Sequence, residues 1–151
     1  MLTILIVSDG SDHFKGAIDE YIKRLGSDLR IETIRPERKR TDPSGIISAE
    51  TDRIIEFLEK HPRLMPVLLD ERGIPEHTRG LSARLVRWRV ESVKPCFVIG
   101  GAYGVDRTRF PDCPVLRLSD LVMPHSLALL VLLEQLYRCR EIDRGSGYHH
   151  Q

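Results

Sequence analysis

Residues 118–138 constrain the fold more than any other part of the sequence. The first half of this stretch suits a loop, because Ser119 favours turns and Pro124 resists strand pairing. From Ser126, which we expect to be the N-cap, the pattern becomes helical, and residues 127–133 are all apolar. A surface helix carries one apolar stripe, so this helix needs cover on more than one side, from its own sheet, a partner chain or both. The pattern fits either a plain core helix or a ligand-binding loop that leads into a buried helix.

Length and composition predict a single domain over residues 1–151 with its own core. The chain is 41% hydrophobic and 30% charged, which is typical of a soluble protein, and we expect no membrane span and no signal peptide. Three cysteines at wide spacings argue against a disulfide framework or a cysteine-ligated zinc site, so we predict a cytoplasmic location and no metal. A net charge of +1 means that any RNA contact has to come from local clusters.

Strand-like and helix-like segments alternate along the chain, which predicts the α/β class with a mostly parallel sheet flanked by helices. The strands are expected at residues 2–7, 31–34 (an edge strand), 66–70 (short and buried), 96–99 and 115–118. Helices are expected at residues 14–25, with Asp12 as a cap and Gly26 as the stop, and at 46–58. A third helix begins at Thr78 or Ser82, and residues 107–110 suit a helical turn.

Residues 35–40, Arg-Pro-Glu-Arg-Lys-Arg, form a basic segment that a proline interrupts. We interpret it as a flexible loop. It fits two descriptions equally well, a contact for phosphate groups or a solvated turn between a strand and a helix.

Three strand ends carry residues that suit a ligand site, since ligands of parallel sheets bind beyond the carboxyl ends of the strands. These ends are residues 69–73, 100–104 and 118–120. The second one, Gly-Gly-x-x-Gly, lets the backbone approach a ligand, but it is neither the dinucleotide fingerprint nor a phosphate loop. By itself it also suits a structural turn.

No familiar catalytic pattern accompanies these loops. Asp70 and Glu71 are adjacent and point to opposite faces of a strand, so they make a poor acid–base pair. His149 and His150 suit either a metal pair or a frayed tail. An enzyme built on this chain would have to position an already activated donor, such as a methyl sulfonium cofactor.

Taken together, the loop motifs resemble the RlmH family of S-adenosylmethionine-dependent methyltransferases in the SPOUT superfamily. The resemblance lies in Val-Leu-Leu-Asp-Glu-Arg-Gly at 67–73, Phe-Val-Ile-Gly-Gly-Ala-Tyr-Gly at 97–104, and Leu-Ser-x-x-x-x-Pro-His-x-Leu at 118–127. It continues with Glu-Gln-Leu-Tyr-Arg at 134–138 and Tyr148-His149. The resemblance implies a C-terminal trefoil knot, a homodimer, and methylation of N3 of a pseudouridine in a stem-loop of 23S rRNA within the assembled ribosome.

The resemblance also implies roles for individual residues. S-adenosylmethionine would be held, largely by backbone groups, at Leu69, Gly100, Gly101, Gly104, Leu118, Ser119, Asp120, Leu121, Val122 and Met123. The nucleotide would lie near His125, Arg138, Tyr148 and His149, partly across the dimer interface. Tyr148 would stack on a base and Arg138 would hold a phosphate or carbonyl group. His149 is the candidate general base for the N3 proton, or else it only orients the nucleobase.

The chain departs from the family pattern on its RNA side. Leu129 stands where the family has an arginine, and the tail Gly-x-Pro-Tyr-His is replaced here by Gly-Ser-Gly-Tyr-His at 145–149, followed by His150 in place of a basic residue. An active rRNA methyltransferase is therefore the first hypothesis. The alternative is a non-catalytic dimer that keeps the fold and binds RNA or the ribosome.

Overall fold

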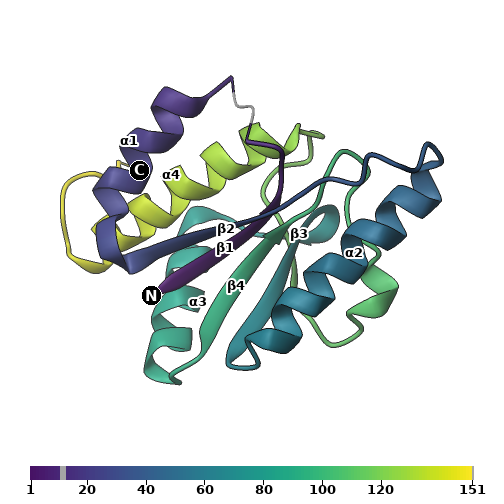
Figure 1. The fold of residues 1–151 in the computed structure, drawn as a ribbon. Helices are drawn as coiled ribbons and strands as arrows, with labels where there is room; N and C mark the ends of the chain where they lie inside the picture. Colours follow the sequence, from purple (N-terminus) through teal and green to yellow (C-terminus); the bar gives the residue numbers. More distant parts are fainter. Residues whose placement is uncertain (11–12, 151) are drawn as a thin grey trace.

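The computed structural model describes residues 1–10 and 13–150 (Figure 1). Five strands form one sheet in the order β2-β1-β4-β3-β5, and every neighbouring pair is parallel. The strands are β1 (Leu2–Val7), β2 (Leu29–Ile34), β3 (Leu64–Pro75), β4 (Lys94–Ile99) and β5 (Val115–Arg117). The α/β class, the parallel sheet and the edge position of the second strand are thereby confirmed.

Helices cover both faces of the sheet (Figure 1). The helices are α1 (Lys15–Leu25), α2 (Pro43–Lys60), α3 (Thr78–Val90) and α4 (His125–Asp143), with short 3-10 turns η1 (Gly26–Asp28) and η2 (Arg107–Arg109). One core lies between the sheet and α1, α3 and α4, and the other lies between the sheet and α2. Strand β1 alternates between them, since Ile4 and Ile6 face the first core and Leu5 and Val7 the second. Its unbroken apolar run reflects burial on both sides.

Helix boundaries follow local chemistry, with one correction. Asp42 caps α2 by accepting a hydrogen bond from the Gly45 N–H at 2.6 Å, and Pro43 occupies the first turn. Helix α4 begins at His125, with Pro124 as its N-cap, so the expected N-cap at Ser126 is wrong. Pro124 has an extended backbone, with φ −61° and ψ 151°, and the chain turns helical directly after it. The predicted cap at Asp12 lies outside the described residues.

Strand β3 is longer than expected and pairs with β5 twice. The short strand predicted at 66–70 extends from Leu64 to Pro75, interrupted by an irregularity between Leu69 and Ile74. Beyond that point Ile74 pairs with Leu116. A Cβ added at Gly73 would lie only 2.7 Å from the Val115 carbonyl oxygen, so the two backbones are in contact. Residues 71–73, which the sequence placed beyond the end of the strand, instead belong to this irregular part of β3.

Helix α4 lies between α1 and α3 and packs on both (Figure 1). Its fully buried side chains are Leu129, Leu132, Leu133, Leu136 and Cys139. The prediction that this helix needs cover on more than one side is confirmed, and its own chain supplies that cover for these residues. Within the described residues, no helix combines the length and apolarity required to cross a membrane.

Candidate cofactor site and RNA-facing residues

The carboxyl ends of β3, β4 and β5 meet around a cavity of about 220 Å³. Nine of the ten residues predicted to bind the cofactor line it: Leu69, Gly100, Gly101, Gly104, Leu118, Ser119, Leu121, Val122 and Met123. Asp120, the tenth, does not line the cavity; its exposed carboxylate lies 3.2 Å from Nε of Arg117. Three loops that are far apart in sequence therefore form one site.

The glycine loop after β4 is a tight turn. The Gly104 N–H donates a 3.1 Å hydrogen bond to the Gly101 carbonyl, and Gly104 has a φ of +79°, which favours glycine. Gly100 is buried against this turn: an added Cβ would lie 2.7 Å from the Gly104 carbonyl carbon and 2.8 Å from Cγ2 of Val105. The glycines thus let the loop close on itself while its backbone lines the cavity.

The loop after β5 brings apolar side chains to the opposite wall. The Ser119 hydroxyl accepts a hydrogen bond from the Leu121 N–H at 2.9 Å, which shapes the turn. Leu121 and Val122 line the cavity, yet they are 75% and 79% exposed. Two adjacent aliphatic side chains therefore lie open to solvent beside the cavity.

An acidic residue at the cavity wall was not among the predicted site residues. Asp70 accepts two hydrogen bonds from the Arg72 guanidinium, at 2.8 and 2.9 Å, and lies 3.8 Å from Arg107. Burial alone would raise the pKa of Asp70, but the hydrogen bonds and charge of Arg72, with the charge of Arg107, hold that pKa below its usual value. Asp70 is therefore an ionised anchor for the loop.

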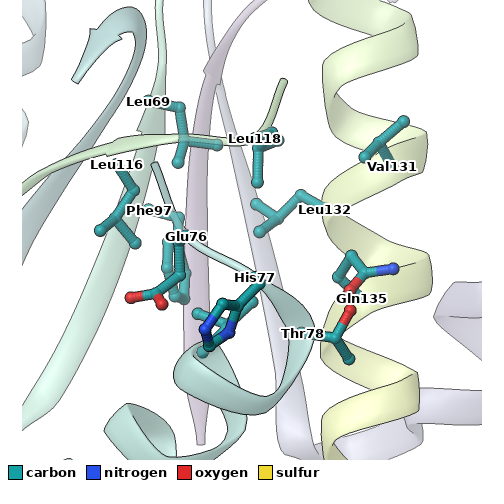
Figure 2. Close-up of a pocket in the computed structure, with 11 residues that line it drawn as sticks. Leu69, Glu76, His77, Thr78, Phe97, Leu116, Leu118, Val131, Leu132 and Gln135 are labelled. Atoms are coloured by element: carbon teal, nitrogen blue, oxygen red, sulfur yellow. Dashed lines mark hydrogen bonds between the residues drawn. The ribbon is translucent and has the colours of Figure 1, made fainter. Parts of the chain in front are cut away.

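A second cavity, of about 250 Å³, adjoins the first (Figure 2). Leu69 and Leu118 line both cavities. Figure 2 shows Thr78 and Gln135 side by side in its lining, and the Thr78 hydroxyl donates a 2.7 Å hydrogen bond to the Gln135 side chain. No sequence pattern indicated this cavity, because α3 and α4 contribute its polar side and contact each other only in the fold.

The residues predicted to bind RNA do not gather in one place. His125 lines the cavity between the ends of β3, β4 and β5, at the start of α4. Arg138 instead pairs with Glu134 at 2.5 Å, and its guanidinium lies 4.8 Å from the centre of the Tyr148 ring. Glu134 is nine positions beyond His125, which places this group about 14 Å further along the helix.

The C-terminal tail is held against α4 and α1. Tyr148 packs edge-on against Tyr137, with ring centres 4.9 Å apart, and its hydroxyl donates to Glu134 at 3.4 Å. A hydrogen bond with Tyr21, together with burial, raises the pKa of Tyr148 to about 12, so its hydroxyl stays protonated near neutral pH. Nδ1 of His149 is buried and has no hydrogen-bond partner among the described residues.

A metal role for the two terminal histidines finds no support in the described residues. Within residues 1–10 and 13–150, no group of three or more histidine, cysteine, aspartate or glutamate side chains is arranged to hold a metal ion. Cys96 and Cys139 are buried, and burial raises the pKa of each thiol to about 12. Neither cysteine is available as a thiolate.

Comparison with known proteins agrees with these features. A family model described as "Predicted SPOUT methyltransferase" matches residues 1–149. A protein of Albidiferax ferrireducens named ribosomal RNA large subunit methyltransferase H is 36% identical over 160 residues, covering 99% of this chain and all of that protein. The protein of the same name from Neisseria gonorrhoeae is 36% identical over 140 residues, covering 89% of this chain and 88% of its own.

Solved structures share the fold. A putative methylase family protein from Neisseria gonorrhoeae superposes with a TM-score of 0.58 at 13% identity, covering 99% of this chain and 86% of that one. A probable methylase family protein from Haemophilus influenzae Rd KW20 superposes with a TM-score of 0.55 at 16% identity, covering 95% of this chain and 66% of that one. The family match over the whole sequence confirms what the loop motifs predicted: the chain belongs to the RlmH family of SPOUT methyltransferases.

Proposed function

We propose that this protein transfers the methyl group of S-adenosylmethionine to N3 of a pseudouridine in a stem-loop of 23S rRNA, acting on the assembled ribosome in the cytoplasm. The observation that carries the proposal is the cavity where the ends of β3, β4 and β5 converge, in a chain whose relatives are named large-subunit rRNA methyltransferases. The described residues that line the cavity include no cysteine, and no group of three or more histidine, cysteine, aspartate or glutamate side chains among the described residues is arranged to hold a metal ion. This composition suits the use of an activated donor.

The residues present fit S-adenosylmethionine. Aliphatic side chains of Leu69, Leu118 and Met123 would cover its apolar parts, and the closed turn from Gly100 to Gly104 leaves space and backbone groups for its polar parts. When bound, this cofactor supplies an electrophilic methyl group on a sulfonium. The protein would hold the donor against the nucleobase and exclude water from the space between them.

The proton on N3 has to leave, and His149 is our candidate to accept it. Imidazole is the most common general base in enzymes, and Nδ1 of His149 has no partner among the described residues. Within one chain His149 is next to Tyr148. The Tyr148 hydroxyl is hydrogen-bonded to Glu134 of α4, far from the cavity. We therefore propose that the tail of one chain completes the cavity of another.

This arrangement requires a homodimer. Support comes from the exposed Leu121 and Val122 beside the cavity, and from α4 residues that its own chain covers only in part, such as Leu127, Leu130 and Val131. Packing these side chains against a second copy would bury them and bring Arg138 and the tail near the partner's cavity.

We also propose the trefoil knot that the family resemblance implies. Strand β5 is at the sheet edge beyond β3, whereas α4 lies between α1 and α3. The chain leaving β5 has to pass the connection between β3 and α3 to reach that place. The backbone contact at Gly73 is consistent with such a crossing. Knots are rare exceptions among protein folds.

A non-catalytic RNA-binding role is the second candidate, and Leu129 is the observation that favours it. This residue replaces the family's arginine and is only 6% exposed, packed in the core of α1, α3 and α4. An RNA contact at this position is therefore lost.

Transfer of radiolabelled methyl from S-adenosylmethionine to ribosomes that lack the modification distinguishes the two roles. We expect label in N3-methylpseudouridine after nucleoside analysis, and none with ribosomes that already carry it. Absence of label with a folded, cofactor-bound protein would refute the enzyme assignment and favour the non-catalytic role.

A further inference from the structure

We propose that the basic segment, residues 35–40, is a preorganised phosphate-binding surface that docks the substrate RNA beside the cofactor cavity. The inference rests on the proposed function, because it takes RNA as the substrate. The segment links β2 to α2 and carries four cationic side chains and one anionic one. Its sequence fits either a phosphate contact or a solvated turn, and its surroundings in the fold favour the first.

The segment is fixed by α2 and is not the flexible loop that the sequence predicted. Arg53 of α2 donates to the Arg35 carbonyl at 2.8 Å and to the Glu37 carboxylate at 2.6 Å. The backbone N–H of Glu37 donates to the Glu50 carboxylate at 2.9 Å, and that of Lys39 donates to the Glu37 carboxylate at 2.6 Å. A surface already held in one conformation loses little entropy when it binds a ligand.

These contacts engage Glu37, the one anionic side chain of the segment, and leave its cationic side chains facing solvent. The Glu37 side chain is 7% exposed, and the hydrogen bond from the Lys39 backbone, with the charge of Arg53, lowers its pKa. The side chains of Lys39 and Arg40 are exposed and have no ion pair or hydrogen bond with any described residue. Arg38 pairs with Asp9 and is still 72% exposed. The outward face of the segment is therefore positive.

One buried carboxylate joins this segment to the cofactor loop. Glu50 is 2% exposed; its Oε1 accepts the Glu37 N–H, and its Oε2 lies so close to Gly101 that an added Cβ there would collide with it. Gly101 lines the cofactor cavity. In the sheet, β2 is two strands from β4, or about 10 Å. If a target base were bound at the cavity, phosphates within a few nucleotides of it along the RNA would therefore reach these cations.

A polyanion near the cavity explains this arrangement better than a solvated turn does. The chain as a whole has a net charge of only +1, so it lacks a global attraction for RNA. Lysine and arginine contacts to phosphates position a protein on nucleic acid without reading sequence. We assign that role to Lys39 and Arg40, acting on the sugar–phosphate backbone that flanks the target nucleotide.

The test is the double variant Lys39→Gln/Arg40→Gln, with binding to large ribosomal subunits measured over a range of salt concentrations. Each lost phosphate contact lowers the slope of log affinity against log salt, so we expect the slope to fall by about 1.5 for two contacts. In methyl-transfer assays KM for ribosomes should rise while kcat changes little, because neither side chain touches the reacting atoms. Cofactor affinity should stay unchanged.

The matched control is Arg63→Gln/Lys94→Gln, which removes the same two charges at the opposite end of the sheet, where β3 and β4 begin. Its salt slope should equal that of the wild type. If Lys39→Gln/Arg40→Gln has the same salt slope and the same KM for ribosomes as the wild type, the basic segment does not dock RNA. This conclusion would hold even if methyl transfer is intact. A wild type that binds subunits but transfers no methyl would refute the proposed function, and the salt slopes would still decide the docking surface.

Discussion

Gly100 shows how the structure changes the meaning of a predicted site residue. The sequence suggested that the glycines at 100–104 let the backbone approach a ligand. In the fold, the nearest atoms to an added Cβ belong to the protein's own loop, at Gly104 and Val105. The residue therefore shapes the cofactor loop and does more than border the cavity.

We expect Gly100→Ala to force the turn from Gly100 to Gly104 apart. The cost should be about 1–3 kcal/mol in the free energy of unfolding, typical of overpacking, together with loss of measurable S-adenosylmethionine binding. Thermal denaturation and calorimetric titration measure the two effects. Gly16→Ala is the control: nothing lies within 4 Å of its added Cβ, so cofactor affinity should be unchanged. Normal affinity in Gly100→Ala would show that the cofactor does not depend on this turn.

At the scale of elements, α4 has two kinds of apolar residue. Leu132 and Leu133 are fully buried in the core, whereas Leu130 is only partly covered by its own chain. If a second copy covers the exposed part of Leu130, substitution by a charged residue should have different effects at the two kinds of position.

Leu130→Glu should weaken the dimer and leave the fold intact, because a charge at a half-covered position can still reach water. Leu132→Glu should unfold the chain, at a cost of several kcal/mol, because its carboxylate would be buried without a partner. Sedimentation velocity and circular dichroism separate these outcomes. A stable dimer in Leu130→Glu would mean that another surface forms the interface.

At the scale of the whole molecule, the residues predicted for the cofactor and for the RNA lie apart within one chain. The cofactor loops and His125 lie at one end of α4, and Arg138 with Tyr148 lies further along it. A site shared between two chains makes a quantitative prediction.

Gly100→Ala and Arg138→Ala chains should each be weakly active alone and regain activity when mixed dimers form. In a random mixture half of the dimers are mixed, and each has one site with both residues intact, so about a quarter of wild-type transfer should return. Co-expression with two affinity tags isolates the mixed dimers, which should show about half of wild-type transfer in methyl-transfer assays. No recovery would place the complete site within one chain. Arg138→Ala should keep normal cofactor affinity, since Arg138 does not line the cavity.

The local sequence pattern was sufficient to predict where the helices and strands lie, apart from some of their ends. The apolar run of β1 and the helical spacing of apolar residues in α1 and α2 are signals that neighbouring residues carry. The loop motifs were specific enough to predict the family, and nine of the ten residues predicted to bind the cofactor line the cavity. The errors at this level were local, such as the N-cap of α4, where the extended backbone of Pro124 decided the boundary.

Contacts between distant residues were decided by the tertiary structure alone. The pairing of Asp70 with Arg107, the second pairing of β3 with β5, and the link from Glu37 through Glu50 to Gly101 join residues that no periodic pattern connects. Helical and strand periodicities report only which face of an element is buried, and not which neighbour covers it. The sequence by itself therefore determined the class of fold, its elements and its family. Only the packing of those elements decided that the basic segment is rigid and next to the cofactor loop, and that the tail is held away from it.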